Sequence, residues 1–418
     1  MNKRRTLLIS SIIFVGVFNA VLKVGEVKAI DPIYIRADGS VDPPSAPISN
    51  FDNSTYTFID DINNSIVVER DNIVIDGGNH IVKGTLNGNG ISLSERVNVT
   101  MKNAEITTFQ NGIYISESSN CNISRNIVRA NDHYGIWLFS SPQNSIVENN
   151  VTANGWHGIH LLWSSNNSVI ENNISASYWI GLWLDGSSNN NIIGNTFNSD
   201  GALFEDSYEN TVEGNIVNKK PLIYLENVSN QTVNDAGQVL LINCFGVRVE
   251  SLNLSDTAVG IELWQTNSCR ITGNNVSANH FFGIRLHNSS SNSICHNNFV
   301  GNPHQVYSYG STNSWDDGYP SGGNYWSDYE GRYSNATEIG DSGIWNMPYV
   351  IDTNVQDNYP LIAQYQNPES PIIMLVLLFT ATLFIIAALV TIIIYRRKRS
   401  ASRSGIKQRK GGPQLCHS

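Results

Sequence analysis

The sequence has few charged residues, few methionines and no clustered cysteines. Only 15% of its 418 residues are Asp, Glu, Lys or Arg, and only 4 are methionine. The five cysteines are spread along the chain, so they indicate no disulfide framework and no thiolate metal cluster. No run of helix-forming residues separates the apolar positions in the middle of the chain, which argues against a helical repeat protein.

A repeat with a period of 23 residues fills the stretch from Asn111 to Asp200. Each unit opens with Gly followed by Ile or Leu, and an Asn recurs fourteen residues after each Gly. The glycines are Gly112, Gly135, Gly158 and Gly181, and the asparagines are Asn126, Asn149, Asn172 and Asn195. The same register returns at Gly260 and at Gly283. A short unit of this kind must stack on its neighbours to bury its apolar face.

The pattern inside each unit predicts strands. Apolar residues fall one and three positions after the glycine, as Ile136 and Leu138 do, and Ser, Asn and Gly occupy the turns. We therefore predict an all-β fold, a right-handed parallel β-helix over 70–302, with coils about 4.8 Å apart. The recurring asparagines, together with a second column at Asn131, Asn154, Asn279 and Asn302, are interpreted as internal amide ladders.

The two ends of the chain predict export and anchoring. Residues 1–29 combine Lys3, Arg4 and Arg5 with an apolar run and a small-residue exit at Ala29, which is typical of a signal peptide, an uncleaved anchor being the alternative. Residues 371–395 form an apolar stretch followed by a basic tail, 396–418. We expect a single transmembrane helix with an extracellular β-helix and a cytoplasmic C-terminus.

The remaining segments are interpreted as caps and an insert. We expect an N-terminal cap over 30–69, an insert near 215–245 where the period is disturbed, and a cap rich in aromatic residues and glycine over 303–365. The net charge of −10 includes the basic ends, so the exported part is more acidic still and nucleic-acid binding is excluded. Several Asn-x-Ser/Thr acceptors, Asn98 and Asn122 among them, allow a glycoprotein.

One outward position does not follow the coil pattern. It lies two residues after the glycine, between two inward residues, and carries Tyr114, Trp137, His160 and Trp183, then Glu262 and Arg285. Tyr134 and Trp156 lie beside it. Exposed aromatic residues at this density mark a binding surface, and flat rings suit sugars. The alternative is that another part of the chain covers this face.

Catalysis on this face is a second hypothesis. Candidate groups are Asp132, His133, His157, His160 and Asp185. Sugar hydrolysis needs two carboxyl groups within about 5 to 9.5 Å of each other, whereas a uronate lyase needs a cation and a base. Lys and Arg are almost absent from 111–200, where Arg125 is one exception, and this weakens the lyase hypothesis.

The sequence resembles a known family at several motifs. These are Ile75-Asp76-Gly77-Gly78-Asn79, the Gly-Ile-x-Leu coils, the run 220–225 and the aromatic stretch from Trp315 to Tyr329. They are similar to the NosD-like right-handed β-helix proteins, also described as CASH-domain proteins, which share the pectin-lyase fold. With the predicted signal peptide and anchor, the chain looks like a cell-surface protein of archaeal type.

The resemblance implies two classes of function. One is carbohydrate binding or sugar hydrolysis, and the other is accessory work in copper maturation, for which soft or imidazole ligands are needed. His157 and His160 are the one close histidine pair. Family members often carry an Asp-rich run suggestive of calcium, whereas this chain has only Glu338, Asp341 and Asp352 in that region.

Our hypothesis from the sequence is therefore a membrane-anchored extracellular β-helix that binds a polysaccharide or surface glycan through the outward aromatic column. A lyase or hydrolase on the same face, a copper or metal accessory protein, and a purely structural surface protein are the alternatives.

Overall fold

The computed structural model describes residues 31–353 and 355–366, together with 382, 386, 390 and 391. The predicted signal peptide, nearly all of the predicted transmembrane segment and the basic tail lie outside the described residues. Within that described part, no helix is long and apolar enough to cross a membrane.

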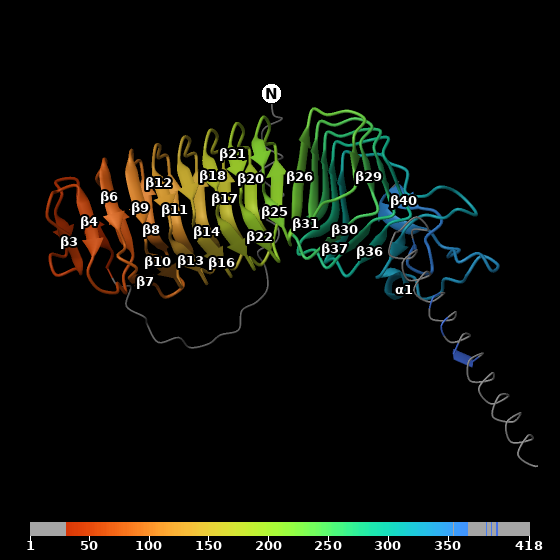
Figure 1. Ribbon diagram of the computed structural model, residues 1–418, viewed down its shortest axis with the longest axis horizontal. Coiled ribbons are helices and arrows are strands. Elements are labelled where there is room, and N and C mark those ends of the chain that lie inside the picture. Colours follow the sequence, from red (N-terminus) through yellow and green to blue (C-terminus); the bar gives the residue numbers. More distant parts are fainter. Residues whose placement is uncertain (1–30, 354, 367–381, 383–385, 387–389, 392–418) are drawn as a thin grey trace, which may run out of the picture.

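The described chain is an all-β solenoid in which strands of successive coils pair in parallel (Figure 1). Sheet 1 has nine strands, in the order β2 (Val41–Asp42), β1 (Ile33–Ile35), β5 (Ile66–Val68), β8 (Asn89–Ser94), β11 (Asn111–Ser116), β14 (Tyr134–Phe139), β17 (His157–Leu162), β20 (Ile180–Asp185) and β23 (Ala202–Glu205). Sheet 3 also has nine: β24 (Thr211–Glu213), β21 (Asn191–Ile193), β18 (Ser168–Ile170), β15 (Ser145–Val147), β12 (Asn122–Ser124), β9 (Val99–Lys102), β6 (Ile73–Asp76), β4 (Thr55–Phe58) and β3 (Ile48–Asn50).

Sheet 2 runs the length of the solenoid with twelve strands. They are β7 (Ile81–Lys83), β10 (Glu105–Thr107), β13 (Ile127–Arg129), β16 (Asn150–Thr152), β19 (Asn173–Ser175), β22 (Thr196–Asn198), β25 (Ile216–Val217), β26 (Lys220–Glu226), β28 (Gln238–Ile242), β31 (Val259–Trp264), β34 (Phe282–His287) and β37 (His304–Tyr309). The later coils add two four-stranded sheets: β27 (Thr232–Val233), β29 (Arg248–Glu250), β32 (Arg270–Thr272) and β35 (Ser293–Cys295), and β30 (Asn253–Ser255), β33 (Asn275–Ser277), β36 (Asn298–Val300) and β38 (Tyr325–Trp326).

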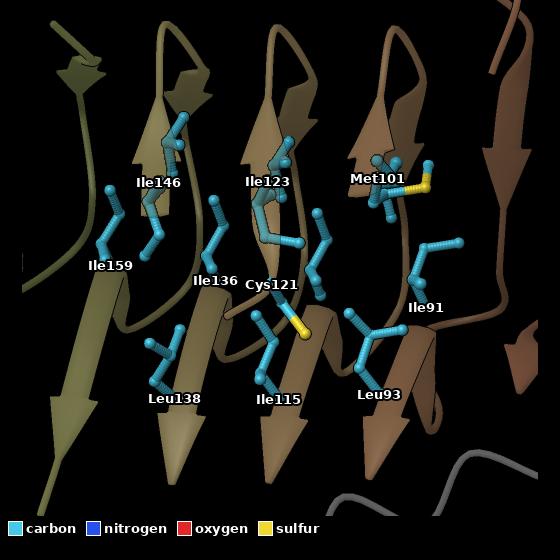
Figure 2. Close-up of a cluster of buried hydrophobic side chains, with 14 of the residues drawn as sticks. Ile91, Leu93, Met101, Ile115, Cys121, Ile123, Ile136, Leu138, Ile146 and Ile159 are labelled. Carbon is cyan, nitrogen blue, oxygen red and sulfur yellow. The ribbon is translucent and has the colours of Figure 1, made fainter. Parts of the chain in front are cut away.

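The core is built by columns of apolar side chains, one residue per strand and coil. Figure 2 shows Ile91, Leu93, Ile115, Ile136 and Leu138 pointing into the interior between the sheets, and all are fully buried. The glycines that open the coils are required because the next coil approaches too closely for a side chain. A Cβ on Gly135 would lie 2.5 Å from the Gly158 carbonyl oxygen.

The predicted amide ladders are present inside the turns. The Asn149 Oδ1 atom accepts hydrogen bonds from the backbone and side-chain N–H groups of Asn126, at 3.0 and 3.1 Å. The Asn149 side chain donates in turn to the carbonyl oxygen of Ile123 and to Asn172 Oδ1. The column through Asn131 and Asn154 is bonded in the same way. A third amide column, which the sequence analysis did not identify, follows Asn144, Asn167, Asn190 and Asn210.

The solenoid is divided by a reversal of the chain. β26 pairs antiparallel with β25 and parallel with β28, so the strand that opens each later coil continues sheet 2 rather than sheet 1. We call residues 31–217 the first segment and residues 220–326 the second segment. The stretch 215–245 thus differs from the predicted insert, because β25 to β28 are part of the solenoid wall. In Figure 1 the two segments meet between β25 and β26.

The two segments also pack against each other beside this reversal, at a junction that we call the elbow. The last strand of sheet 1, β23, contacts β31, and Leu203 packs with Val259 and Phe282. The backbone groups at the unpaired edge of β23 form hydrogen bonds with side chains of the second segment. Gln238 bonds to both backbone groups of Ala202, and Glu262 accepts from the Phe204 N–H. Glu262 and Arg285, predicted to be outward, are buried here with 0% and 5% exposure.

Both ends of the solenoid carry additional structure. β1 and β5 already lie in sheet 1, so coil-like strands begin within the predicted N-terminal cap. At the other end, β37 adds a strand, and Trp315, Trp326, Tyr329 and Tyr349 are buried over the last coil with the short helix α1 (Tyr329–Arg332) and the hairpin β39 (Tyr349–Asp352) and β40 (Val355–Asp357). Asp357 fixes this cap by accepting from Trp326 Nε1 and the Asn324 N–H.

Candidate functional site

A column of aromatic rings runs along the outer face of sheet 1. Parallel pairing of β11, β14, β17 and β20 places Tyr114, Trp137, His160 and Trp183 at the same position in successive coils. We call these four residues the ring column. The His160 ring lies nearly parallel to Trp183, with centroids 4.5 Å apart, and nearly parallel to Trp137 at 6.5 Å.

The stacking decides which part of each ring faces outward. His160 lies between two nearly parallel indoles, so its faces are turned toward protein rings. A ligand lying along the middle of the column therefore meets ring edges, whereas the sequence analysis expected open ring faces. Tyr134 completes this surface, with its ring 4.8 Å from that of Trp137 and 5.4 Å from that of His160.

Several nitrogen atoms of this surface are buried without a hydrogen-bond partner in the described part of the chain. They are Trp137 Nε1, His157 Nδ1, both ring nitrogens of His160 and Trp183 Nε1. The His160 residue is only 3% exposed, and burial lowers the pKa of its imidazole to about 3. His160 is therefore neutral at physiological pH, with one N–H donor and one acceptor nitrogen. Unsatisfied buried polar atoms are unusual in folded proteins, and each costs about 1–3 kcal/mol.

A second line of rings lies beside the ring column, before the start of each strand. His133 stacks on Trp156 with centroids 3.7 Å apart, Trp156 lies 5.6 Å from Trp179, and Trp179 lies 6.2 Å from Phe281. We call these four residues the side ladder. Phe281 belongs to the second segment and reaches the ladder through the elbow. No local sequence signal relates it to Trp179, because the two positions are about a hundred residues apart and only the chain reversal brings them together.

The candidate catalytic residues are distributed over this surface. His157 and His160 lie close together, with ring centroids 5.7 Å apart, and burial beside His160 lowers the pKa of His157 well below its usual value. Asp132 is exposed on the preceding turn, where its carboxylate lies 3.4 Å from His133 Nε2. Asp185 pairs in register with Leu162, so it lies one strand over from Leu162 rather than from His160.

Asp185 has an acidic neighbour that the sequence analysis did not select. Glu205 occupies the equivalent position on β23, and its Oε2 lies 2.9 Å from Arg285 Nη2. The Glu205–Arg285 pair ties the two segments together, and Arg285 also bonds to Glu262 of its own segment at 2.7 Å. Burial, together with the charges of Glu205 and Asp206, raises the pKa of Asp185 to about 6. One carboxyl group of this pair is therefore easily protonated, while the other is paired with a guanidinium.

Cationic side chains near the ring column are engaged elsewhere. Arg125 pairs with Glu148 and Arg129 with Glu105 on other sheets. Arg285 lies beside the last strand of sheet 1, but Glu205 and Glu262 engage it. This pairing disfavours the neutralisation of a uronate that a lyase requires.

The donors for a metal ion do not converge in the described part of the chain. No group of three or more His, Cys, Asp or Glu side chains there could hold a metal ion. The four cysteines that the structure describes, Cys121, Cys244, Cys269 and Cys295, are buried and unpaired in separate coils. His157 and His160 remain the closest imidazole pair. The residues present thus do not fit a copper site of several soft ligands.

Two family models match the chain. The model described as "Right handed beta helix region" matches residues 45–197 and 89–234, and "Periplasmic copper-binding protein (NosD)" matches residues 198–331. The chain belongs to the NosD-like right-handed β-helix family. The family resemblance inferred from the sequence is thereby confirmed. The two models overlap over residues 198–234, a stretch that includes β25 and β26 of this NosD-like protein.

Solved structures similar to this NosD-like chain share little sequence with it. ORF18 of Geobacillus virus E2 has 14% identity and a TM-score of 0.33, covering 62% of this chain and 50% of its own. The mannuronan C-5 epimerase AlgE4 A-module of Azotobacter vinelandii has 15% identity and a TM-score of 0.33, with 62% and 74% covered. The periplasmic alginate epimerase AlgG has 15% identity and a TM-score of 0.33, with 64% and 80% covered.

This chain therefore spans about half the length of the viral protein. No curated protein sequence matches the chain significantly.

Proposed function

We propose that this protein binds a polysaccharide or surface glycan along the outer face of sheet 1. The observation that carries the proposal is the ring column, which places the half-buried rings of Tyr114, Trp137 and Trp183 at one position of successive coils. Sugars offer C–H groups that pack against such aromatic rings. Because Trp137, His160 and Trp183 belong to three adjacent coils, the surface extends along the solenoid axis and suits a linear chain of sugars.

The test is a glycan array probed with the full-length chain. We expect binding to at least one glycan, and at least a tenfold loss of affinity when Trp137→Ala and Trp183→Ala are combined. Tyr319→Ala is the matched control, because Tyr319 is 55% exposed near the C-terminal end of the solenoid. Absence of binding to every glycan, or equal losses in the double variant and the control, would contradict the proposal.

A second candidate is hydrolysis of the bound glycan by Asp185 and Glu205. Their environments separate their protonation states, since the pKa of Asp185 is raised to about 6 while Glu205 pairs with Arg285. Such a pair suits a general acid and a nucleophile or base. Release of reducing ends from a polysaccharide panel, lost in Asp185→Asn, would support this activity, whereas glycan binding without any release would favour a binding protein.

We also propose that the protein is exported and anchored in the cell membrane. The basis is the sequence alone: an apolar stretch over 371–395 precedes a tail with eight Lys and Arg residues and no acidic residue. Protease treatment of intact cells is expected to remove the β-helix and leave the tail. Recovery of an untouched full-length chain would argue against an extracellular β-helix.

A further inference from the structure

A pocket opens at the elbow, at the end of the side ladder. It has a volume of about 940 Å³ and is lined by both segments. The first segment contributes Ala176, Ser177, Tyr178, Trp179 and Ser199, and the second contributes His280, Phe281, Pro303 and His304. The pocket therefore exists only because the chain reverses between β25 and β26 and brings β34 and β37 beside the turns that precede β20 and β23.

Aromatic rings form the walls of this elbow pocket. The Trp179 and Phe281 rings are 17° from parallel, and His304 lies edge-on to Phe281 with centroids 6.4 Å apart. Tyr178 stands at the rim and is 69% exposed. Because Trp179 also stacks on Trp156, the pocket wall is continuous with the side ladder of the first segment.

The polar groups of the elbow pocket are hydrogen-bonding but carry no fixed charge. His280 Nε2 lies 3.2 Å from Asp256 Oδ1, which orients the ring, while the buried Nδ1 atom has no partner in the described part of the chain. Ser199 donates to the other oxygen of Asp256. None of the described residues that line the pocket is Lys, Arg, Asp or Glu. This lining matches a hydroxylated, uncharged ring better than a uronate or a phosphate, which would require a cationic partner.

The elbow also closes one end of the outer face of sheet 1. β23 is the last strand of that sheet, and beyond it the second segment packs against Ile180 and Leu203 through Val259 and Phe282. A chain of sugars that follows His133, Trp156 and Trp179 toward the elbow therefore meets Phe281 and cannot continue in the same direction.

We propose that the elbow pocket binds the terminal, uncharged sugar residue of a glycan whose following residues lie along the side ladder. The proposal rests on the glycan-binding function proposed above and adds two properties to it, recognition of a chain end and preference for a neutral sugar. A groove that is open at both ends would have neither property.

The experiment uses the full-length chain and hexasaccharides of β-1,4-glucose, β-1,4-mannose and α-1,4-glucose. Each is prepared unlabelled, labelled with a fluorophore at the reducing end, and labelled at the opposite end. We expect the best hexasaccharide to lose at least tenfold in affinity when one end is labelled and to keep its affinity when the other is labelled. Equal affinity for the two labelled forms and the unlabelled form would overturn end recognition.

Variants of the pocket wall complete the test. Phe281→Ala is expected to weaken binding of the unlabelled hexasaccharide at least tenfold, and Phe281→Tyr, which keeps the ring, to preserve it. Phe245→Ala is the matched control, because Phe245 is an exposed phenylalanine of the same segment outside the pocket. Unchanged affinity in Phe281→Ala would overturn the elbow site.

The outcomes also separate this inference from the function on which it rests. If Trp137→Ala with Trp183→Ala abolishes binding while Phe281→Ala does not, the glycan surface stands and the elbow site falls. If no hexasaccharide and no array glycan binds the wild-type chain, both fall. A hexauronate that binds as tightly as the best neutral hexasaccharide would overturn the preference for a neutral sugar.

Discussion

The amide ladder and the ring column are two buried polar columns with opposite hydrogen bonding. Each places one side chain per coil along the solenoid axis, and Asn149 and His160 are almost equally buried, at 1% and 3% exposure. The amide group of Asn149 both accepts and donates within the ladder, whereas both ring nitrogens of His160 have no partner in the described residues. A column that satisfies itself stabilises the fold, whereas buried nitrogen atoms without partners lower its stability.

The largest loss of stability is expected when a side chain of the amide ladder is removed. Asn149→Ala removes the acceptor of two Asn126 N–H groups and the donor to Ile123 and Asn172. We expect the free energy of unfolding to fall by about 3 kcal/mol, because several buried partners lose their bonds together. Chemical denaturation measures this change. Asn173→Ala is the control, because Asn173 is exposed and directly follows the ladder residue Asn172 of the next coil; it should change stability by less than about 0.5 kcal/mol.

A substitution at His160 in the ring column is not expected to reduce stability. His160→Phe keeps a flat ring between Trp137 and Trp183 but removes both unpartnered nitrogens. We expect the free energy of unfolding to be unchanged or to rise by about 1 kcal/mol, and glycan affinity to fall less than in the variant that combines Trp137→Ala and Trp183→Ala. Titration calorimetry and denaturation of the same preparation separate the two quantities. A large loss of stability would place His160 with the structural residues instead.

The sequence predicts the satisfied column far better than the other features. Asn126, Asn149 and Asn172 recur at one spacing, and each bonds to the asparagine at the equivalent position of the neighbouring coil. The periodicity alone therefore identifies their role. Ring positions were also predictable, since Trp137 and Trp183 follow the same register. The hydrogen-bonding state of His160 was not, because it depends on how neighbouring rings stack and cover it.

Contacts across the elbow could not be inferred from the period. Phe281 and Glu205 meet Trp179 and Arg285 only because the chain reverses at β25 and β26. The sequence shows that the period is disturbed there, but a disturbed period does not distinguish a surface insert from a restart of the solenoid in a new direction.

Lowering the pH is expected to reduce the free energy of unfolding more in the wild type than in His160→Phe. The folded-state pKa of His160, about 3, lies below the usual 6.5, so the unfolded chain binds the proton more readily between these values. Stability is therefore complete above about pH 6.5 and is lost as the pH falls toward 3. We expect the difference between variant and wild type to grow by roughly 2 kcal/mol between pH 7.5 and 5. A pH-independent difference would contradict the burial of a neutral imidazole.

Asp200, which takes the place of an asparagine in the second amide column, is expected to give a pH dependence of stability of opposite sign. It accepts from the Ser177 and Gly201 N–H groups, and burial raises its pKa to about 7. Because the folded-state pKa lies above the unfolded value, stability is lost as the pH rises from about 4 to 7. Asp200→Asn removes this titration, so its stability relative to the wild type should increase by about 3 kcal/mol between pH 4.5 and 8, measured by thermal or chemical unfolding.

The chain reversal at β25 and β26 also bears on how the protein comes apart. In a solenoid each coil is stabilised by the coils on either side. The main apolar residues form two clusters: one runs from Ile33 to Val217 and takes in Leu222 and Leu240 just beyond the reversal, and the other runs from Val233 to Tyr349. Cooperative unfolding that spreads from coil to coil is therefore expected to stop close to the elbow. Under a pulling force or in denaturant, one block of coils can open while the other keeps its structure.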